Sequence, residues 1–312
     1  MYIYSFSGES AGKMASMGSR ILRTGSLCLS LALFACERTA TFQPNPPDKA
    51  EFRIDHLGTY SSKLGGEDEK EIQGTIFQTT LSGTWEKQDG QFHLQRRLDT
   101  MIARGYHKAS MPHELEKRIS LETWLGPDLI PVRTKGYDSL KAIFSKVQPR
   151  EDYRKQLLHA SDTNAFKAWE RDWWRTATFL PREKLEARTA LKVDALNGKL
   201  ETYKADSAHF DGPRPRLKKA CLDFTVYYHR SDSLPLLMEQ FFFSSVQNRK
   251  FRGQPWKPGR IQGFLQYSVE RTTGLPCFHS RTEIADMVLE KKDDKPETPV
   301  QLYRYEEDIY QY

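Results

Sequence analysis

The sequence predicts an α+β fold: a curved antiparallel β-sheet with helices from the middle of the chain packed on one face. Alternating apolar and polar residues dominate the first and last thirds of the 312-residue chain, whereas apolar residues at helical spacing occupy the middle. Helices that are segregated from the strands typically cover one face or end of an antiparallel sheet. This order of segments therefore favours the α+β class.

The segment 51–137 predicts four antiparallel strands. Asp89-Gly90 separates two strand-like runs, and both residue types tolerate the positive φ of a tight hairpin. A second pair of runs, KRISLETWL and LIPVRTKG, is joined by a turn at 126–128. Alternation at a period of two places these side chains on one face: Phe92, Leu94, Arg96, Leu98, Ile119, Leu121, Thr123 and Leu125.

The segment 138–180 predicts helices. Apolar residues between Leu140 and Val147 follow helical spacing, and Phe166, Trp169 and Trp173 recur at i, i+3 and i+7. Pro181 is expected to end the last helix, because proline has no amide proton for a helix interior.

The segment 183–312 again predicts strands. Its strand-like runs include KKACLDFTVYYHR and PVQLYRYEEDIYQY, and a turn is expected at Thr273-Gly274. The globular region would then span 51–312. An alternative is that 51–137 and 183–312 are two β-rich halves around the helices.

The run Ser26–Ala35 has no charged residue, although 28% of the chain is charged. It is too short to cross a hydrocarbon core, which needs about 20 residues. Lys13, Arg20 and Arg23 precede it. A basic segment followed by a short apolar run and a small residue is typical of a secretory signal peptide.

Leu33-Phe34-Ala35-Cys36 resembles the lipobox of bacterial lipoproteins, although Phe34 departs from the usual pattern. The resemblance implies that residues 1–36 form a signal peptide ending at Cys36, and that lipid on Cys36 anchors the protein to a membrane. The proline-rich segment 37–50 is then a flexible tether, and Glu37 favours outer-membrane delivery. The alternatives are an uncleaved anchor, plain secretion or a cytosolic protein.

Four cysteines are present, and two of them, Cys221 and Cys277, lie in the globular region. An even pair in an oxidising compartment predicts a disulfide. The alternative is two separate buried thiols.

Beyond the predicted signal peptide, the sequence contains no motif for a metal, a cofactor or a catalytic nucleophile, since that part lacks HExxH, CxxC, GxSxG and SxxK patterns. Glu306-Glu307-Asp308 has the pattern of a solvated strand end. The net charge of +6 is too small for a nucleic-acid footprint. We expect no enzyme activity, no metal, no cofactor and no nucleic-acid partner.

Two aromatic segments are candidate binding sites. The first holds Trp169, Trp173 and Trp174. Trp173 and Trp174 are adjacent, so we expect one of them to face away from the core and to line an apolar pocket for a hydrophobic ligand. The alternative is that these side chains are simply core, because helical spacing is what packing on a sheet requires.

The second segment, QNRKFRGQPWKPGR, combines basic residues with Trp256. Arg249, Lys250 and Arg252 suit anionic lipid headgroups. The alternative is a solvated loop between strands.

The segment VERTTGLP, with the order of elements, gives the globular region a weak resemblance to periplasmic lipid-carrier and lipoprotein-carrier folds. In those folds a half-open curved sheet and helices enclose an apolar cavity. The leading hypothesis is a non-enzymatic, lipid-anchored envelope lipoprotein that binds a hydrophobic or envelope ligand or a partner protein. The alternatives are a structural or adhesive surface lipoprotein without a pocket, and a hydrolase of envelope polymers.

Overall fold

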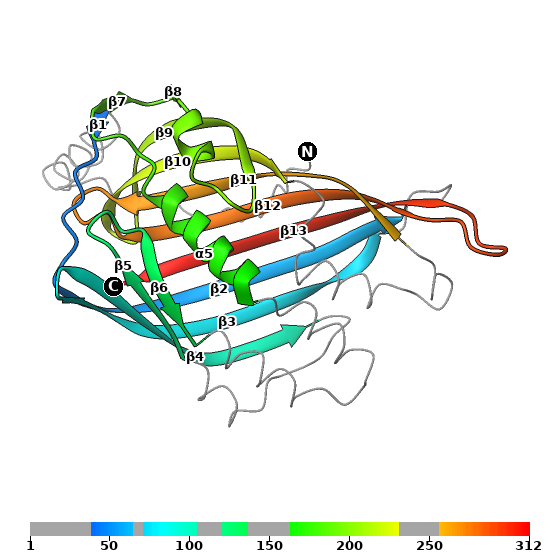
Figure 1. The fold of residues 1–312 in the computed structure, drawn as a ribbon, viewed down its shortest axis with the longest axis horizontal. Coiled ribbons are helices and arrows are strands. Elements are labelled where there is room, and N and C mark those ends of the chain that lie inside the picture. The colour runs from blue at the N-terminus through cyan, green and yellow to red at the C-terminus, as the bar shows by residue number, and fades with distance from the viewer. Residues whose placement is uncertain (1–38, 65–70, 105–119, 137–162, 231–255) are drawn as a thin grey trace, which may run out of the picture. The chain divides into compact units, whose positions relative to one another are not determined.

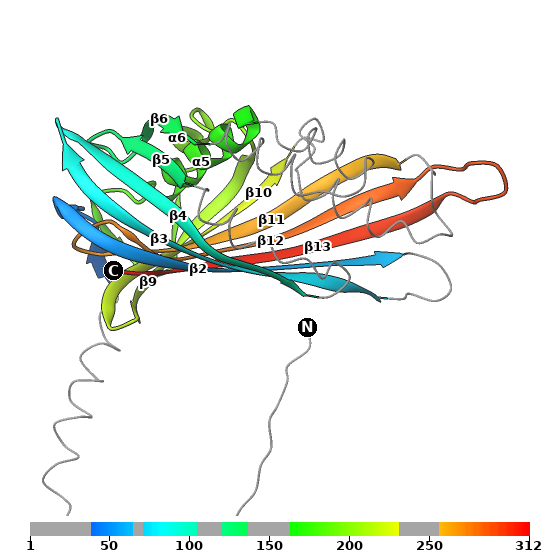
Figure 2. The ribbon, with the colours of Figure 1, turned by 90° about the horizontal axis from the view of Figure 1, so that it is seen from below.

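The structure is a computed structural model that describes residues 39–64, 71–104, 120–136, 163–230 and 256–312. Within these residues the chain forms an 11-stranded sheet, a two-stranded sheet and two helices. Helix α5 (Thr163–Ala177) lies across the concave side of the large sheet, as the two ribbon views show (Figures 1 and 2). Helix α6 (Asp194–Asn197) is a single turn.

The large sheet has the strand order β6-β5-β4-β3-β2-β13-β12-β11-β10-β9-β8. All its neighbouring strands are antiparallel, and the pairing of β2 with β13 joins the early and late strands into one sheet. Its strands are β2 (Lys49–Leu64), β3 (Glu71–Gln88), β4 (Gln91–Arg104), β5 (Ser120–Leu125), β6 (Pro131–Lys135), β8 (Thr189–Leu191), β9 (Lys204–Arg216), β10 (Lys219–Arg230), β11 (Trp256–Glu270), β12 (Pro276–Leu289) and β13 (Thr298–Gln311). The small sheet pairs β1 (Thr39–Thr41) with β7 (Lys184–Glu186).

The hairpin between β3 and β4 forms at the predicted place. Gln88 pairs with Gln91, and both residues between them have positive φ, 49° at Asp89 and 77° at Gly90. These angles match the two-residue turn whose twist suits antiparallel strands. The local prediction is therefore confirmed.

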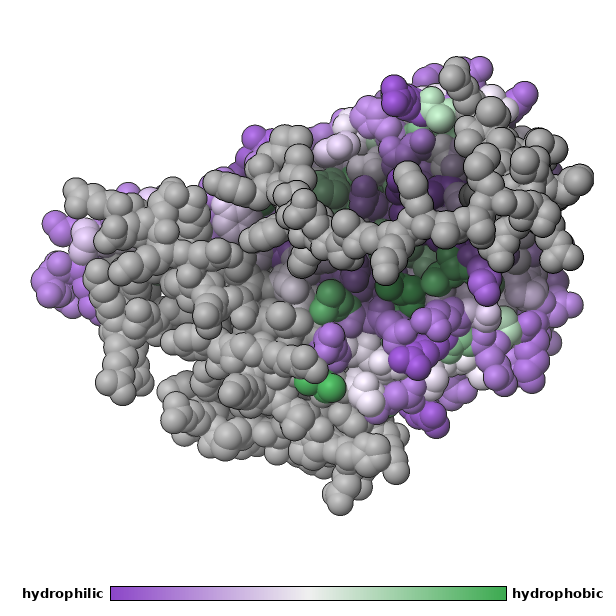
Figure 3. Space-filling view, turned by 180° about the vertical axis from the view of Figure 1, so that it is seen from behind, coloured by the Kyte–Doolittle hydropathy of each residue, from purple (hydrophilic) through white to green (hydrophobic). Residues whose placement is uncertain are grey.

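The concave face of the sheet carries the main core. The register places Phe224 opposite Tyr267 and Val226 opposite Leu265, and all four side chains are buried. Because side chains alternate between faces, these residues share one side of the sheet. On the side of the molecule opposite α5, the visible described surface mixes many hydrophilic with fewer hydrophobic side chains (Figure 3).

Helix α5 fills the concavity with aromatic side chains. The Trp174 ring lies 6.3 Å from Trp85 of β3, measured between centroids. The Trp173 ring lies 6.2 Å from Tyr267 of β11 and 6.0 Å from Tyr310 of β13. One helix therefore packs against strands from both the early and the late part of the chain.

The predicted α+β class is wrong, because the described chain is mostly β. Its strands reach 18 residues, whereas its two helices have 15 and four residues. The physical reason is the curvature of the sheet, which lets the single helix α5 fill the described core. The predicted antiparallel sheet is confirmed. Residues 138–162 of the predicted helical segment lie outside the described residues.

Within the predicted tether at 37–50, the described residues pack against the sheet. Strand β1 pairs with β7, and Phe42 is 2% exposed. The indole Nε1 of Trp85 donates a hydrogen bond of 2.9 Å to the Pro47 carbonyl. Among the described residues no helix combines the length and apolar character needed to span a membrane.

Candidate functional site

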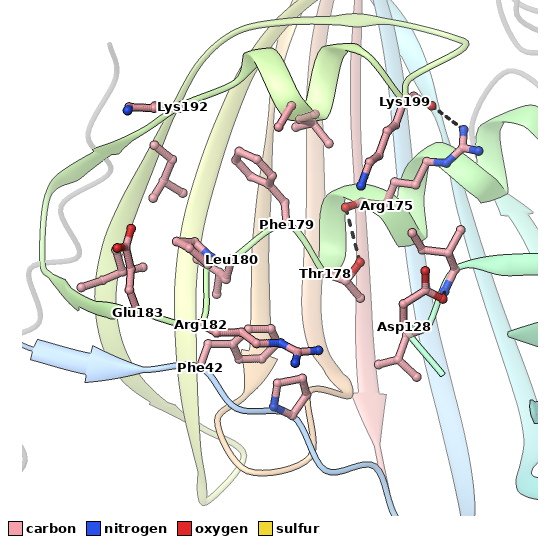
Figure 4. A pocket seen from close by; sticks show the side chains of 18 of the residues that line it. Phe42, Asp128, Arg175, Thr178, Phe179, Leu180, Arg182, Glu183, Lys192 and Lys199 are labelled. Carbon is pink, nitrogen blue, oxygen red and sulfur yellow. Dashed lines mark hydrogen bonds between the residues drawn. The ribbon is translucent and has the colours of Figure 1, made fainter. Parts of the chain in front are cut away.

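A pocket of about 580 Å³ lies where the C-terminal end of α5 meets the β5–β6 turn and the segment from β7 to α6. We call it the α5 pocket (Figure 4). It is lined by Phe42, Pro44, Pro46, Pro127, Asp128, Leu129, Ile130, Arg175, Thr178, Phe179, Leu180, Pro181, Arg182, Glu183, Leu185, Thr189, Ala190, Leu191, Lys192, Ala195, Leu196 and Lys199.

One wall is the predicted turn between β5 and β6. The Leu129 amide donates to the Gly126 carbonyl at 2.9 Å, and the Asp128 carboxylate accepts the Ile130 amide at 3.2 Å. Leu129 has a φ of 64° and is 2% exposed, so its side chain is directed into the protein from a tight turn. This turn therefore presents both an apolar and an acidic side chain at the pocket.

The opposite wall forms where α5 ends. The Thr178 amide bonds to the Trp174 carbonyl at 3.0 Å, and the Phe179 amide bonds to the Thr176 carbonyl at the same distance. Pro181 cannot continue the helix. The chain turns here, and Leu180 is buried with 3% of its surface exposed.

Asp172 fixes this end of α5 to the chain beyond α6. Its carboxylate is fully buried and accepts the Glu201 amide at 2.9 Å, the Thr202 amide at 2.6 Å and the Thr202 hydroxyl at 2.7 Å. Arg175 lies 3.4 Å from Asp172 and 2.8 Å from Glu201. The hydrogen bond from Arg171 and the one from Arg175 lower the pKa of the Glu201 carboxyl to about 2, although partial burial acts in the opposite direction.

The floor of the α5 pocket is apolar. The floor residues either belong to the buried hydrophobic core or pack against that core. They come from the residue after β1, the end of α5, β7, β8 and α6: Phe42, Leu180, Leu185, Leu196, Phe179 and Leu191. Ligand pockets for small molecules typically measure about 300–1,000 Å³ and have mainly apolar walls. The α5 pocket meets both criteria.

The rim of the α5 pocket is basic. In Figure 4 the side chains of Arg182 and Lys199 point into the pocket, whereas Lys192 points away from it. Among the described residues, neither Arg182 nor Lys199 has a side-chain hydrogen bond or ion pair. Arg175 differs, because it is bonded to Glu201 and to the Lys199 carbonyl.

The tryptophans predicted as pocket residues lie elsewhere. Trp173 is 9% and Trp174 is 4% exposed, and their rings meet edge to face with centroids 4.7 Å apart. The expectation that one of the two faces away from the core is wrong, because the curved sheet surrounds α5 on two sides. Trp169 is half-buried over the Arg281 guanidinium, 4.1 Å from the ring centroid. None of the three lines the α5 pocket.

The structure describes few of the other residues that were predicted as sites. Cys36, Arg249, Lys250 and Arg252 lie outside the described residues, so the lipid anchor and the basic segment stay predictions. Trp256 begins β11, and the structure does not describe its side chain.

The two cysteines of the globular region are adjacent. The Sγ atoms of Cys221 on β10 and Cys277 on β12 lie 2.9 Å apart, and both residues are buried. The thiols are free in the structure, whereas a disulfide joins its sulfurs at about 2.05 Å. The structure brings the predicted partners together, and the bond stays a prediction.

A network of buried charges beneath α5 was missed from the sequence. Burial opposes ionisation of Glu283, yet the positive charges of Arg230, Arg281 and Arg304 lower its pKa to about 2. Glu306, predicted as solvated, is 9% exposed and accepts a 3.0 Å hydrogen bond from Arg281. The signal in the sequence was the period-two alternation of the strands, which places these charged residues on the same face as the inward-facing apolar ones.

The residues of the α5 pocket were also missed, because they come from segments that are far apart in the sequence. No local pattern marks Arg182 or Lys199 as partners of Phe42. Across the described chain, no group of three histidine, cysteine or acidic side chains is arranged to bind a metal.

Comparisons with known proteins find remote structural similarities. No protein-family model matches the sequence, and no curated protein matches it significantly. Lipovitellin, from a study of lipid–protein interactions, aligns with 87% of this chain at 9% identity and a TM-score of 0.42. This chain covers 25% of the lipovitellin chain, a quarter of its length.

Two further structures align at lower scores. DynF from the dynemicin biosynthesis pathway of Micromonospora chersina aligns at 7% identity and a TM-score of 0.17, over 88% of this chain and 86% of its own. A DUF1329 family protein from Desulfovibrio piger aligns at 9% identity and a TM-score of 0.16, over 92% and 89%. At these scores the similarities assign no family to this chain.

Proposed function

We propose that the chain is a lipid-anchored cell-envelope protein without enzymatic activity, and that it binds the apolar part of an amphipathic ligand in the α5 pocket. The observation that carries the proposal is the pocket itself, about 580 Å³ with an apolar floor. Burying apolar ligand surface against such a floor contributes about 25 cal/mol for each Å² removed from water. The lipobox resemblance at Cys36 supports anchoring at the outer membrane.

The experiment uses the purified full chain in nanodiscs and a diazirine derivative of palmitic acid. After illumination, mass spectrometry locates labelled peptides. We expect label on peptides from residues 178–199, which carry much of the pocket lining. Absence of label from the whole chain would contradict ligand binding.

A pair of variants makes the test specific. Ala195 is exposed and lines the pocket, so Ala195→Trp fills it with a large side chain. Ala220 is exposed on β10 and lies outside the pocket, so Ala220→Trp is the matched control. We expect Ala195→Trp to weaken labelling by about tenfold, a difference of about 1.4 kcal/mol. The control should label like the unmodified chain.

A structural or adhesive role is the second candidate. The packing of Trp173 and Trp174 in the core, away from the α5 pocket, favours it. Equal labelling of the Ala195→Trp and Ala220→Trp variants would support this role over ligand binding.

Anchoring is tested separately. Mass spectrometry of the mature N-terminus should find acyl groups on Cys36. An unmodified Cys36 peptide in protein from a lipoprotein-processing bacterium would refute the anchor.

A further inference from the structure

We propose that the α5 pocket selects amphiphiles with an anionic headgroup, a phosphate or a carboxylate, and that Arg182 and Lys199 bind this group. The inference rests on the proposed function, because it names the class of ligand for the same pocket. It is carried by two cationic side chains that enter an apolar pocket and have no partner among the described residues.

The two cations approach the pocket from different elements. Arg182 follows the end of α5, and Lys199 follows α6. Figure 4 shows both side chains directed into the space between these segments. Both are exposed, so neither depends on a buried ion pair for its position. Figure 4 draws their charged ends at different sides of the pocket, so each can contact an anionic headgroup from its own side.

The other charged side chains of the lining do not cancel these cations. Arg175 is held by Glu201 and lies 3.4 Å from Asp172, so its charge is already compensated. The Asp128 carboxylate accepts the Ile130 amide within its own turn, and no ion pair joins it to a cation among the described residues. In Figure 4 the carboxylate of Glu183 lies well away from the guanidinium of Arg182. With Arg175 compensated, three cations remain in the lining against two carboxylates, so the lining carries a small net positive charge.

The combination of charges and apolar surface decides the ligand class. A guanidinium presents a planar set of donors that matches phosphate and carboxylate oxygens, and an ammonium adds a second point charge. The floor formed by residues such as Phe42, Leu180 and Leu196 offers no side-chain hydrogen bonds to a polar ligand, but it can bury an acyl chain. An acyl chain with an anionic headgroup satisfies both parts of the pocket.

The experiment measures competition for the same photolabel on the full chain in nanodiscs of neutral lipid. The competitors share a palmitoyl chain: palmitate, 1-palmitoyl lysophosphatidic acid, 1-palmitoyl lysophosphatidylcholine and monopalmitoylglycerol. We expect both anionic compounds to compete at concentrations about tenfold lower than the other two. Comparison of the two anionic compounds then distinguishes a phosphate from a carboxylate preference.

Charge variants assign the preference to residues. Arg182→Gln and Lys199→Gln should each reduce the advantage of anionic over neutral competitors by at least about threefold, and the double variant should abolish it. Lys204→Gln is the matched control, because Lys204 is exposed on β9 and does not line the pocket. It should retain the full preference.

The salt dependence of the unmodified chain supplies a measurement that needs no variant. Raising the ionic strength from about 0.05 to 0.5 M should weaken anionic competition several-fold and leave monopalmitoylglycerol unchanged, because salt screens exposed charges. If all four competitors act equally at both salt concentrations, or if Arg182→Gln and Lys199→Gln keep the anionic preference, the inference is overturned while ligand binding stands. If no amphiphile competes and no label appears, the proposed function itself fails.

Discussion

Replacing Asp172 by asparagine tests whether its buried carboxylate holds α5 and the α5 pocket in place. The side chain is fully buried, and its two oxygens face the amides of Glu201 and Thr202, the Thr202 hydroxyl and the Arg175 guanidinium. Asparagine has the same shape but one acceptor oxygen and no charge.

The magnitude follows from these contacts. The amide oxygen at the Oδ2 position can keep the two bonds from Thr202, at 2.6 Å and 2.7 Å in the structure, and the 2.9 Å bond from the Glu201 amide. The amide nitrogen at the Oδ1 position then faces Arg175, which is also a donor. Three hydrogen bonds change from a charged to a neutral acceptor, and at about 1 kcal/mol each the free energy of unfolding falls by about 3 kcal/mol.

The assay is thermal unfolding of the full chain, followed by tryptophan fluorescence. A loss of about 3 kcal/mol should lower Tm by about 6–12 °C, given about 2–4 °C for each kcal/mol in a domain near this size. Asp194→Asn is the control, because Asp194 is exposed at the start of α6. The reasoning is wrong if Asp172→Asn melts within about 2 °C of the unmodified protein.

Three further predictions concern the core, the thiols and the pH response. Trp174→Ala should lower the free energy of unfolding by about 3–5 kcal/mol in urea titrations, because it removes a buried indole; a loss below about 1 kcal/mol would contradict this packing. Non-reducing peptide mapping of protein secreted into an oxidising compartment should link Cys221 to Cys277, and two freely alkylated thiols would refute the bond. Glu201, whose pKa is about 2 in the folded chain against an ordinary 4.5, stabilises the fold above pH 4.5. That contribution is lost as the pH falls from 4.5 towards 2, so Glu201→Gln should flatten acid unfolding there, and an unchanged profile would count against it.

Local patterns in the sequence predicted local features correctly. The Asp89-Gly90 turn forms the β3–β4 hairpin, because its positive φ angles depend on those two residues alone. The inward residues of β4, such as Leu94, are buried as the period of two predicts. The helix that carries Trp169 and Trp173 ends before Pro181, where proline prevents its continuation.

The sequence by itself thus determined the β3–β4 and β5–β6 hairpins and one amphipathic helix, since each depends on residues that are neighbours along the chain. It predicted four strands over 51–137 where the structure has five, β2 to β6, and it did not predict β9. Only the tertiary structure decided that the sheet curves around α5, so that Trp173 and Trp174 are both buried. It also gathered Phe42, Arg182 and Lys199 around one pocket. The curvature of the sheet and the pocket arise from contacts between segments that are distant in the sequence. The apolar periodicity of a short stretch of sequence does not reveal those contacts.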